Sequence, residues 1–221
     1  TIVPTVMQFV DIAGLVKGAS EGEGLGNQFL ANIRGVDAIA HVLRCFDDDD
    51  IAHVLGSVDP VRDRDIVETE LALSDLDMVE RRLDKVAKKA KSGETEAIRE
   101  QAVLNKVFEA LSDGRPVRDM EFEPEEMTVL RSFQLLTAKP VLYVANVAEG
   151  DLPEGDNAWV RALRETVEAE NAGEVVVICS AIESELAELE PDEKAEFLHD
   201  LGLEEPGLDR LIHAAYHLLG L

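Results

Sequence analysis

Three short apolar segments constrain the fold of this chain more than any other feature of its sequence. They are Ala38–Phe46, Val141–Ala145 and Glu174–Cys179, and stretches with helical spacing separate them. A nearly continuous apolar run of this length is typical of a strand that is buried on both faces of a sheet. Strands that alternate with helices predict a mostly parallel sheet with helices on both faces. The sequence therefore predicts a Rossmann-like α/β fold, to which Thr5–Val10 is expected to add a further strand.

A helical periodicity interrupts this alternation. From about Asp65, apolar residues such as Leu76 and Val79 recur at helical spacing, and a second amphipathic stretch follows the break at Ser92-Gly93. Two long amphipathic segments joined by a short turn predict an antiparallel helical hairpin. We therefore expect an inserted helical (coiled-coil) subdomain over residues 61–134. Residues 1–60 and 135–221 are then the first and second parts of one α/β domain.

Composition excludes several classes of function. The 221 residues include 46 acidic and 21 basic ones, which gives a formal net charge of -25. Such a surface repels phosphate backbones, so direct DNA binding is not expected, although local basic patches stay possible. No apolar run reaches membrane-spanning length, so no membrane association is expected. Cys45 and Cys179 follow no metal-like spacing, which favours free, buried thiols in a reducing, cytoplasmic setting.

The stretch from Phe9 to Gly14 carries the first chemical signal. It delivers Asp11, and three residues later Gly14, onto a loop that continues into the glycine-rich tract Gly18–Gly26. In phosphate-hydrolysing switch proteins an Asp at a strand end holds Mg²⁺, usually through a water, and the Gly offers its backbone N–H to the terminal phosphate. Alone, this pattern occurs by chance in many proteins.

The loops after the apolar segments strengthen that signal. In a doubly wound sheet, ligands bind beyond the carboxyl ends of the strands. The residues expected there are Asp11–Gly14, Phe46–His53, Asn146–Glu149 and Ser180-Ala181. Four loops that gather at one edge of a sheet predict a shared ligand site.

Several of these tracts resemble a known family. Asp11-Ile-Ala-Gly-Leu-Val-Lys-Gly-Ala-Ser and Gly22-Glu-Gly-Leu-Gly-Asn resemble the third nucleotide-binding motif and switch region of Obg-like P-loop NTPases. Arg44-Cys-Phe-Asp, residues 135–149 and residues 201–212 resemble the YchF subfamily, the Obg-like ATPases. The resemblance spans essentially the whole chain.

This resemblance carries expectations about function. It implies a P-loop NTPase-type sheet and a Mg²⁺-dependent, cytoplasmic ATPase that favours ATP over GTP and associates with the ribosome or the translation machinery. The family's G-x-x-x-x-G-K-[ST] phosphate loop is expected before Thr1, and its small C-terminal β-rich (TGS) domain after Leu221. The chain is therefore expected to be the core of a longer protein.

The choice of base follows from the tract that starts at Asn146. GTPases use Asn-Lys-x-Asp, whose Asp accepts hydrogen bonds from guanine, whereas this chain has Asn146-Val147-Ala148-Glu149. We expect Asn146 to contact the base edge and Val147 to pack on its face. Ser180 and Ala181 are expected to close the pocket through backbone contacts, and Phe46 to form a further wall. For Val147 and Phe46, ordinary core packing stays an open alternative.

Activation of water needs a residue other than the one that Ras-like proteins use. Those proteins place a Gln directly after Asp-x-x-Gly, and this chain has Leu15, which cannot orient a water. The resemblance implies that His53, in the loop after the strand predicted over Ala38–Phe46, takes this role, since a His can position or deprotonate water. A loop His without a role is the open alternative.

A second hypothesis treats the chain as a binding module. In it, the helical hairpin and the acidic surface contact a protein partner, and the chain has no nucleotide activity of its own. The two hypotheses differ in whether Asp11 and His53 take part in nucleotide hydrolysis.

Overall fold

The protein is described from a computed structural model that covers residues 6–12, 25–51, 53 and 55–221. Its contacts divide the chain into two compact units. The first unit comprises Thr1–Asp37 and Asp65–Pro140, and the second comprises Ala38–Arg64 and Val141–Leu221. The domain bounds expected from the sequence stay a prediction.

The second unit is built on a parallel sheet. Its described strands are β1 (Ile39–Arg44), β2 (Val141–Asn146) and β3 (Glu174–Ile178), and they lie in the order β1-β2-β3. Both pairings are parallel, as the sequence predicted. The chain continues through the short helix η2 (Glu149–Asp151) and the helices α5 (Ala158–Ala169), α6 (Ser180–Glu188), α7 (Pro191–Asp200) and α8 (Gly207–Leu219).

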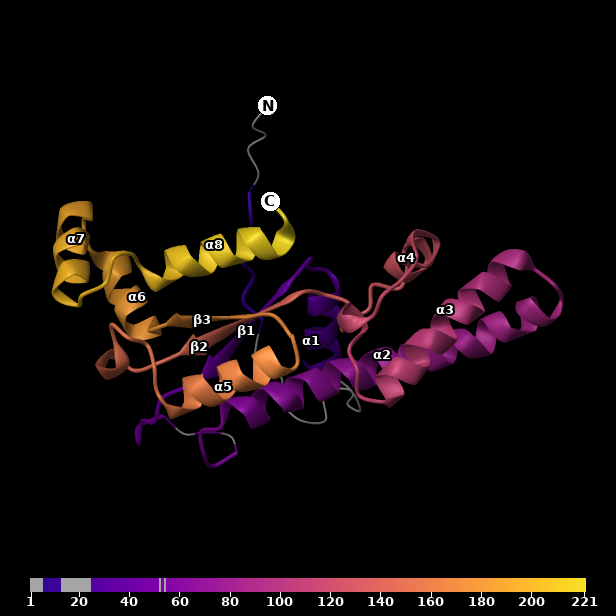
Figure 1. Ribbon diagram of the computed structural model, residues 1–221, viewed down its shortest axis with the longest axis horizontal. Coiled ribbons are helices and arrows are strands. Elements are labelled where there is room, and N and C mark those ends of the chain that lie inside the picture. The colour runs from indigo at the N-terminus through magenta and orange to yellow at the C-terminus, as the bar shows by residue number, and fades with distance from the viewer. Residues whose placement is uncertain (1–5, 13–24, 52, 54) are drawn as a thin grey trace. The chain divides into compact units, whose positions relative to one another are not determined.

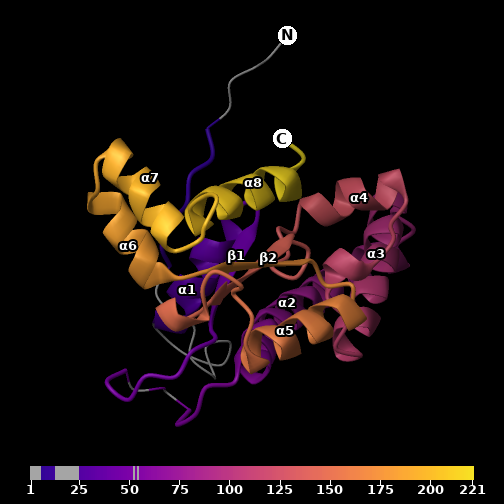
Figure 2. The same ribbon diagram turned by 60° about the vertical axis from the view of Figure 1, so that its left-hand side comes forward.

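Helices cover both faces of this sheet. Figures 1 and 2 show α5 and α8 on opposite faces, and both contact β3. Helix α5 places Val160, Leu163 and Val167 against the sheet at helical spacing, and all three are buried. Asn157 starts the helix by accepting a hydrogen bond from the backbone N–H of Val160, which satisfies one of the free donors at a helix N-terminus. The predicted Rossmann-like α/β fold is therefore confirmed.

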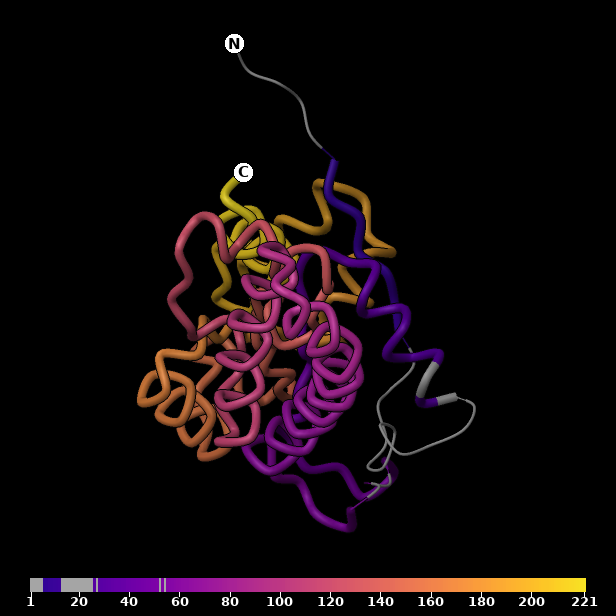
Figure 3. The backbone as a smooth tube through the Cα atoms, turned by 90° about the vertical axis from the view of Figure 1, so that its right-hand side faces the viewer, coloured from indigo at the N-terminus to yellow at the C-terminus, as the bar shows by residue number. Residues whose placement is uncertain are grey.

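The first unit contains the helical hairpin. The hairpin consists of helices α2 (Pro60–Lys91) and α3 (Thr95–Ser112), which run antiparallel to each other (Figures 1 and 3). The first residues of α2 belong to the second unit. Gly93 has a φ of 87°, a conformation that favours glycine, and its backbone N–H bonds to the carbonyl of Ala90 as α2 ends. The predicted turn at Ser92-Gly93 is confirmed. The remaining elements of the unit are α1 (Leu25–Arg34), η1 (Val117–Asp119) and α4 (Pro124–Arg131).

Two strand predictions need correction. The strand predicted over Ala38–Phe46 was expected to be buried on both faces, but in β1 the side chain of Val42 is 58% exposed. Strand β1 has β2 as its one neighbour in the described sheet, whereas β2 lies between two strands and is buried from Val141 to Ala145. The described part of the strand predicted over Thr5–Val10 is not a strand, because it pairs with no neighbour in the described sheet; Phe9 and Val10 are exposed.

Helix α4 ends earlier than its sequence suggests. The apolar pattern after Pro124 predicts a helix as far as Leu136, but α4 stops at Arg131. Gln134 adopts a left-handed φ of 50°, and the backbone N–H groups of Leu136 and Thr137 bond to the side chain of Asp75. A helix that continued would need those N–H groups for its own carbonyls.

Asp75 of α2 is a buried hydrogen-bonding centre of the first unit. Its side chain is fully buried, and its carboxylate accepts bonds from the N–H groups of Leu136 (3.0 Å) and Thr137 (2.8 Å) and from the Thr137 hydroxyl (2.8 Å). The guanidinium of Arg34, the last residue of α1, lies 3.5 Å away. Burial raises the pKa of the Asp75 carboxyl, and these hydrogen bonds and Arg34 partly oppose that shift. One carboxylate thus joins α1, α2 and the segment after α4.

We expect Asp75→Ala to lower the free energy of unfolding by about 2–5 kcal/mol, because it leaves buried donors without an acceptor. Urea unfolding followed by circular dichroism measures the change. Asp77→Ala is the control: Asp77 lies on the same helix, pairs with Arg81 at the surface, and should cost no more than about 0.5 kcal/mol. Equal unfolding midpoints for the two variants would contradict the role of Asp75.

Candidate functional site

The carboxyl ends of the three strands form one edge of the sheet. The last residues of the strands, Arg44, Asn146 and Ile178, are direct partners in the two pairings. The loops that leave this edge carry most of the residues that the sequence predicted as site residues. In parallel α/β sheets this edge is where ligands bind.

Asn146 connects two of these loops. Its side-chain Oδ1 accepts a hydrogen bond of 2.9 Å from the backbone N–H of Ser180, the first residue of α6. The backbone N–H of Val147 bonds to the carbonyl of Ile178 at 2.9 Å. The structure therefore brings Asn146, Val147 and Ser180 together with the adjacent Ala181. The Nδ2 group of Asn146 donates to no residue in the described part of the chain.

The four residues at this junction differ in exposure. Ser180 and Ala181 are exposed, and Asn146 is partly exposed. Val147 is 1% exposed and belongs to the core cluster of the second unit, which matches the packing role that the sequence left open. The contact of Val147 with a base stays a prediction.

Phe46 lies on the loop that follows β1. The guanidinium of Arg44 lies over its ring, 4.8 Å from the centroid. The same guanidinium donates to the backbone carbonyls of Phe46 (3.0 Å), Asp48 (3.2 Å) and Ile51 (2.8 Å). Arg44 therefore organises the loop that carries Phe46. The sequence offered no reason to expect this role for Arg44, whose one distinguishing feature is its position near the end of an apolar strand.

His53 pairs with the start of α2. Its Nε2 lies 2.8 Å from Oδ2 of Asp63, and its Nδ1 accepts a hydrogen bond of 3.1 Å from the backbone N–H of Leu55. Asp63 was not predicted as a site residue, because a separation of ten residues across a loop and a helix start has no sequence signature.

Asp11 and Gly14 are the predicted residues at the phosphate end. Asp11 belongs to the first unit and is exposed, and Gly14 lies outside the described residues. Their placement around a nucleotide stays a prediction. Mg²⁺ in nucleotide sites takes one or two carboxylates together with phosphate oxygens and waters, so an exposed carboxylate such as that of Asp11 fits the donor set. Within the described residues no cluster of three or more potential ligand side chains could hold a metal ion.

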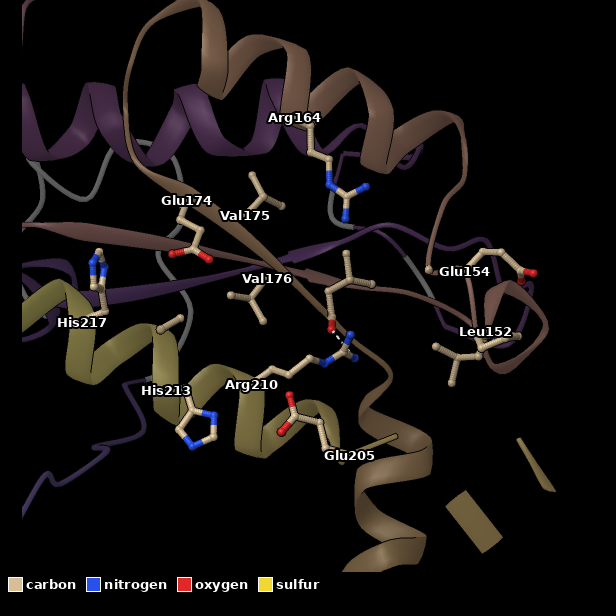
Figure 4. Close-up of a pocket in the computed structure, with 14 residues that line it drawn as sticks. Leu152, Glu154, Arg164, Glu174, Val175, Val176, Glu205, Arg210, His213 and His217 are labelled. Carbon is tan, nitrogen blue, oxygen red and sulfur yellow. Dashed lines mark hydrogen bonds between the residues drawn. The ribbon is translucent and has the colours of Figure 1, made fainter. Parts of the chain in front are cut away.

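A separate pocket of about 550 Å³ lies along β3. Figure 4 shows Arg164 of α5, Glu174 of β3 and His213 of α8 around it. Arg210 donates to the carbonyl of Val177 at 3.1 Å, which satisfies a backbone group of this strand. None of the predicted site residues lines this pocket, so it is distinct from the edge where the strands end.

A parallel sheet with helices on both faces, whose strand ends gather polar loops, is common to several classes of α/β protein. The comparisons with known proteins assign this sheet to an α/β fold of the P-loop NTPase type. The model of the family described as "50S ribosome-binding GTPase" matches residues 2–146. The chain therefore belongs to that family. In the described residues no helix is both long and apolar enough to cross a membrane.

Within this family the chain is similar to YchF proteins over its whole length. It is 51% identical over 220 residues to "Ribosome-binding ATPase YchF" of Haemophilus influenzae, covering 100% of this chain and 60% of that protein. It is 52% identical over 221 residues to the protein of the same name from Bacillus subtilis, covering 99% and 60%. The solved structure of the Schizosaccharomyces pombe YchF GTPase matches with a TM-score of 0.81 and 35% identity, covering 94% of this chain and 56% of that one. The chain thus spans about 60% of the length of these curated relatives.

The bond between Asn146 and Ser180 leads to a stability prediction. Asn146→Asp keeps an acceptor for the N–H at the start of α6, where a negative charge is favourable, so the free energy of unfolding should change by less than about 0.5 kcal/mol. Asn146→Leu removes the acceptor and should cost about 1–2 kcal/mol. Chemical denaturation of both variants measures the difference, and the bond is unimportant if the two variants are equally stable.

Proposed function

We propose that this protein is a Mg²⁺-dependent switch NTPase that binds and hydrolyses ATP, with GTP as the weaker substrate. The observation that carries the proposal is the junction of Asn146 with Ser180 at the carboxyl edge of the sheet, in a chain of this family. Curated relatives are named ribosome-binding ATPases, and the solved relative is named a GTPase.

The base end of the site rests on Asn146. Since its Oδ1 is occupied by the N–H of Ser180, its Nδ2 group is the part that faces a ligand as a donor, and purine rings offer nitrogen acceptors. GTPases have an Asp three residues after this Asn, and this chain has the longer Glu149 on the exposed helix η2. Adenine has an acceptor where guanine has its ring N–H, so a carboxylate there gives ATP no benefit. Phe46 and the backbone at Ser180 and Ala181 complete the base pocket.

The phosphate end of the site rests on Asp11, Gly14 and His53. Asp11 is the residue that would hold the Mg²⁺, and the backbone N–H of Gly14 would donate to the terminal phosphate. The metal supplies neutralisation of charge on the phosphates when it is bound. His53 orients the attacking water, because Leu15 cannot.

The partner is the ribosome, and the surface proposed to contact it is the tip of the helical hairpin, residues 81–99. Residues 81–99 hold seven of the 21 basic residues and three of the 46 acidic ones. Lys85, Lys88, Lys89 and Lys91 are exposed and form no ion pair with any residue in the described ranges. This basic tip stands out in a chain with a net charge of -25, and RNA phosphates are its complement. Such a partner implies a cytoplasmic protein.

The basic tip also supports the second candidate, a hairpin module without nucleotide activity. The two candidates differ in what the strand-end residues do. If the protein is only a binding module, it hydrolyses no ATP. Substitutions at Asp11 then leave its affinity for the partner unchanged.

We expect Asp11→Ala to lower ATP hydrolysis by at least about 100-fold in the protein expressed from its full gene, because the metal loses its protein carboxylate. Phosphate release with ATP and then GTP, in the presence of Mg²⁺, measures the loss and ranks the two substrates. Glu154→Ala, at an exposed position, is the control. Hydrolysis by Asp11→Ala at the rate of the control would reject the proposed phosphate end.

Reversing charge at the hairpin tip tests the partner. We expect the double variant Lys88→Glu with Lys89→Glu to weaken binding to purified ribosomes by at least about 10-fold and to flatten its salt dependence, since phosphate contacts release counterions. Co-sedimentation at several salt concentrations measures both effects. The double variant Lys194→Glu with Arg164→Glu, on α7 and α5, has the same change in net charge and is the control. ATP hydrolysis in the absence of ribosomes should be unchanged, and ribosome binding equal to that of the control would exclude the tip as the contact.

A further inference from the structure

The two ring nitrogens of His53 are in different chemical states. The backbone N–H of Leu55 can only donate, so Nδ1, which lies 3.1 Å from it, must carry a lone pair. The ring proton is therefore on Nε2, which donates to Oδ2 of Asp63 at 2.8 Å. The partners of the ring thus select one tautomer, with the proton on Nε2.

Asp63 is itself held in place. Its Oδ1 accepts hydrogen bonds from Nε (3.1 Å) and Nη2 (3.0 Å) of Arg62. Arg62 in turn donates to the hydroxyl (3.0 Å) and the carbonyl (2.6 Å) of Ser57. With one oxygen occupied by Arg62, the carboxylate presents its other oxygen to His53.

The first turn of α2 fixes the backbone of this pair. Asp59 precedes the helix, and its carboxylate accepts from the N–H of Arg62 while its carbonyl accepts from the N–H of Asp63, both at 3.0 Å. Since Asp63 is anchored in a helix, the orientation of His53 is set by an element with little freedom of its own.

The two hydrogen bonds of the ring differ in strength. The bond to Asp63 involves a carboxylate, and the two side chains are only 16% and 20% exposed, so it is stronger than a bond between neutral groups. The bond from Leu55 joins two neutral groups, and Leu55 is exposed. The ring therefore gives up the Leu55 bond more easily, and this frees the lone pair of Nδ1 while Asp63 still holds the ring.

We propose that Asp63 is the positioning residue of His53: it keeps the ring proton on Nε2, so that Nδ1 is the atom that accepts a hydrogen bond from the attacking water. This inference rests on the proposed role of His53 in hydrolysis. Arg62 contributes indirectly, because its hydrogen bonds hold Asp63 in the orientation that the ring needs.

The change Asp63→Asn tests the assignment because Arg62 dictates how the new amide is placed. Two donors of Arg62 face one side of the group, so the amide oxygen turns toward Arg62 and the NH₂ group toward His53. Nε2 must then accept, the proton moves to Nδ1, and Nδ1 can no longer accept from water. Asp63→Glu keeps a carboxylate and is the conservative variant.

Two measurements follow. We expect Asp63→Asn to lower kcat for ATP hydrolysis by about 10- to 100-fold with little change in KM, and Asp63→Glu to retain more activity. In a His53→Ala background, Asp63→Asn should cause no further loss, because the ring through which it acts is absent. Nitrogen-15 NMR of the imidazole should show the proton on Nε2 in the parent protein and on Nδ1 in Asp63→Asn. Asp49→Asn, at an exposed position of the same loop, should behave as the parent.

The outcomes separate this inference from the proposed function. If His53→Ala hydrolyses ATP at the parental rate, the proposed role of His53 fails and the inference fails with it. If His53→Ala is impaired but Asp63→Asn is not, the inference alone is overturned. An equal loss from Asp63→Asn in the parent and in the His53→Ala background also overturns it, since that result indicates a structural role. The inference is likewise overturned if the His53 ring keeps its proton on Nε2 in Asp63→Asn.

Discussion

Parallel pairing of β2 with both of its neighbours is the constraint on which the rest of the second unit depends. The ladder aligns Arg44, Asn146 and Ile178, so that three loops leave the sheet at the same edge. Because β2 lies between two strands and helices cover the sheet, it is buried from Val141 to Ala145, as expected of a central strand. The bond between Asn146 and Ser180 depends on this register, because a shift of one residue would turn the Asn146 side chain away from Ser180.

Several of the few basic side chains in this acidic protein bind backbone carbonyls or carboxylates that hold local structure. Arg44 binds three carbonyls of the loop after β1, and Arg62 orients Asp63. Arg34 lies beside the buried Asp75, and Lys139 donates to the carbonyls at the end of α1. Most of the remaining positive charge on α2 gathers near the hairpin tip. In a chain with more than twice as many acidic as basic residues, this distribution separates the basic side chains that hold local structure from the lysines of the hairpin tip, which form no ion pair within the described ranges.

Hydrogen bonds to a buried carboxylate explain why helix α4 is shorter than its sequence predicts. The sequence after Pro124 has helical spacing as far as Leu136, yet two of its N–H groups bond to Asp75 and the helix stops at Arg131. Asp75 is one charge among many on a helix with an exposed face, and nothing in its sequence surroundings marks it as buried. Its role follows from what packs over it.

The sequence by itself determined the elements that local chemistry controls: the three apolar strands, the turn at Gly93 and the amphipathic helices, because the spacing of apolar residues and the backbone freedom of glycine act over a few neighbours. It also placed Asn146 and Ser180 at strand ends. Only the tertiary structure decided that Asn146 bonds to Ser180, that His53 pairs with Asp63, that Arg44 holds Phe46 and that Val42 of β1 stays exposed. These features depend on side chains that are distant in sequence, or on a strand that lacks a second neighbour, and the direction of one hydrogen bond cannot be inferred from periodicity.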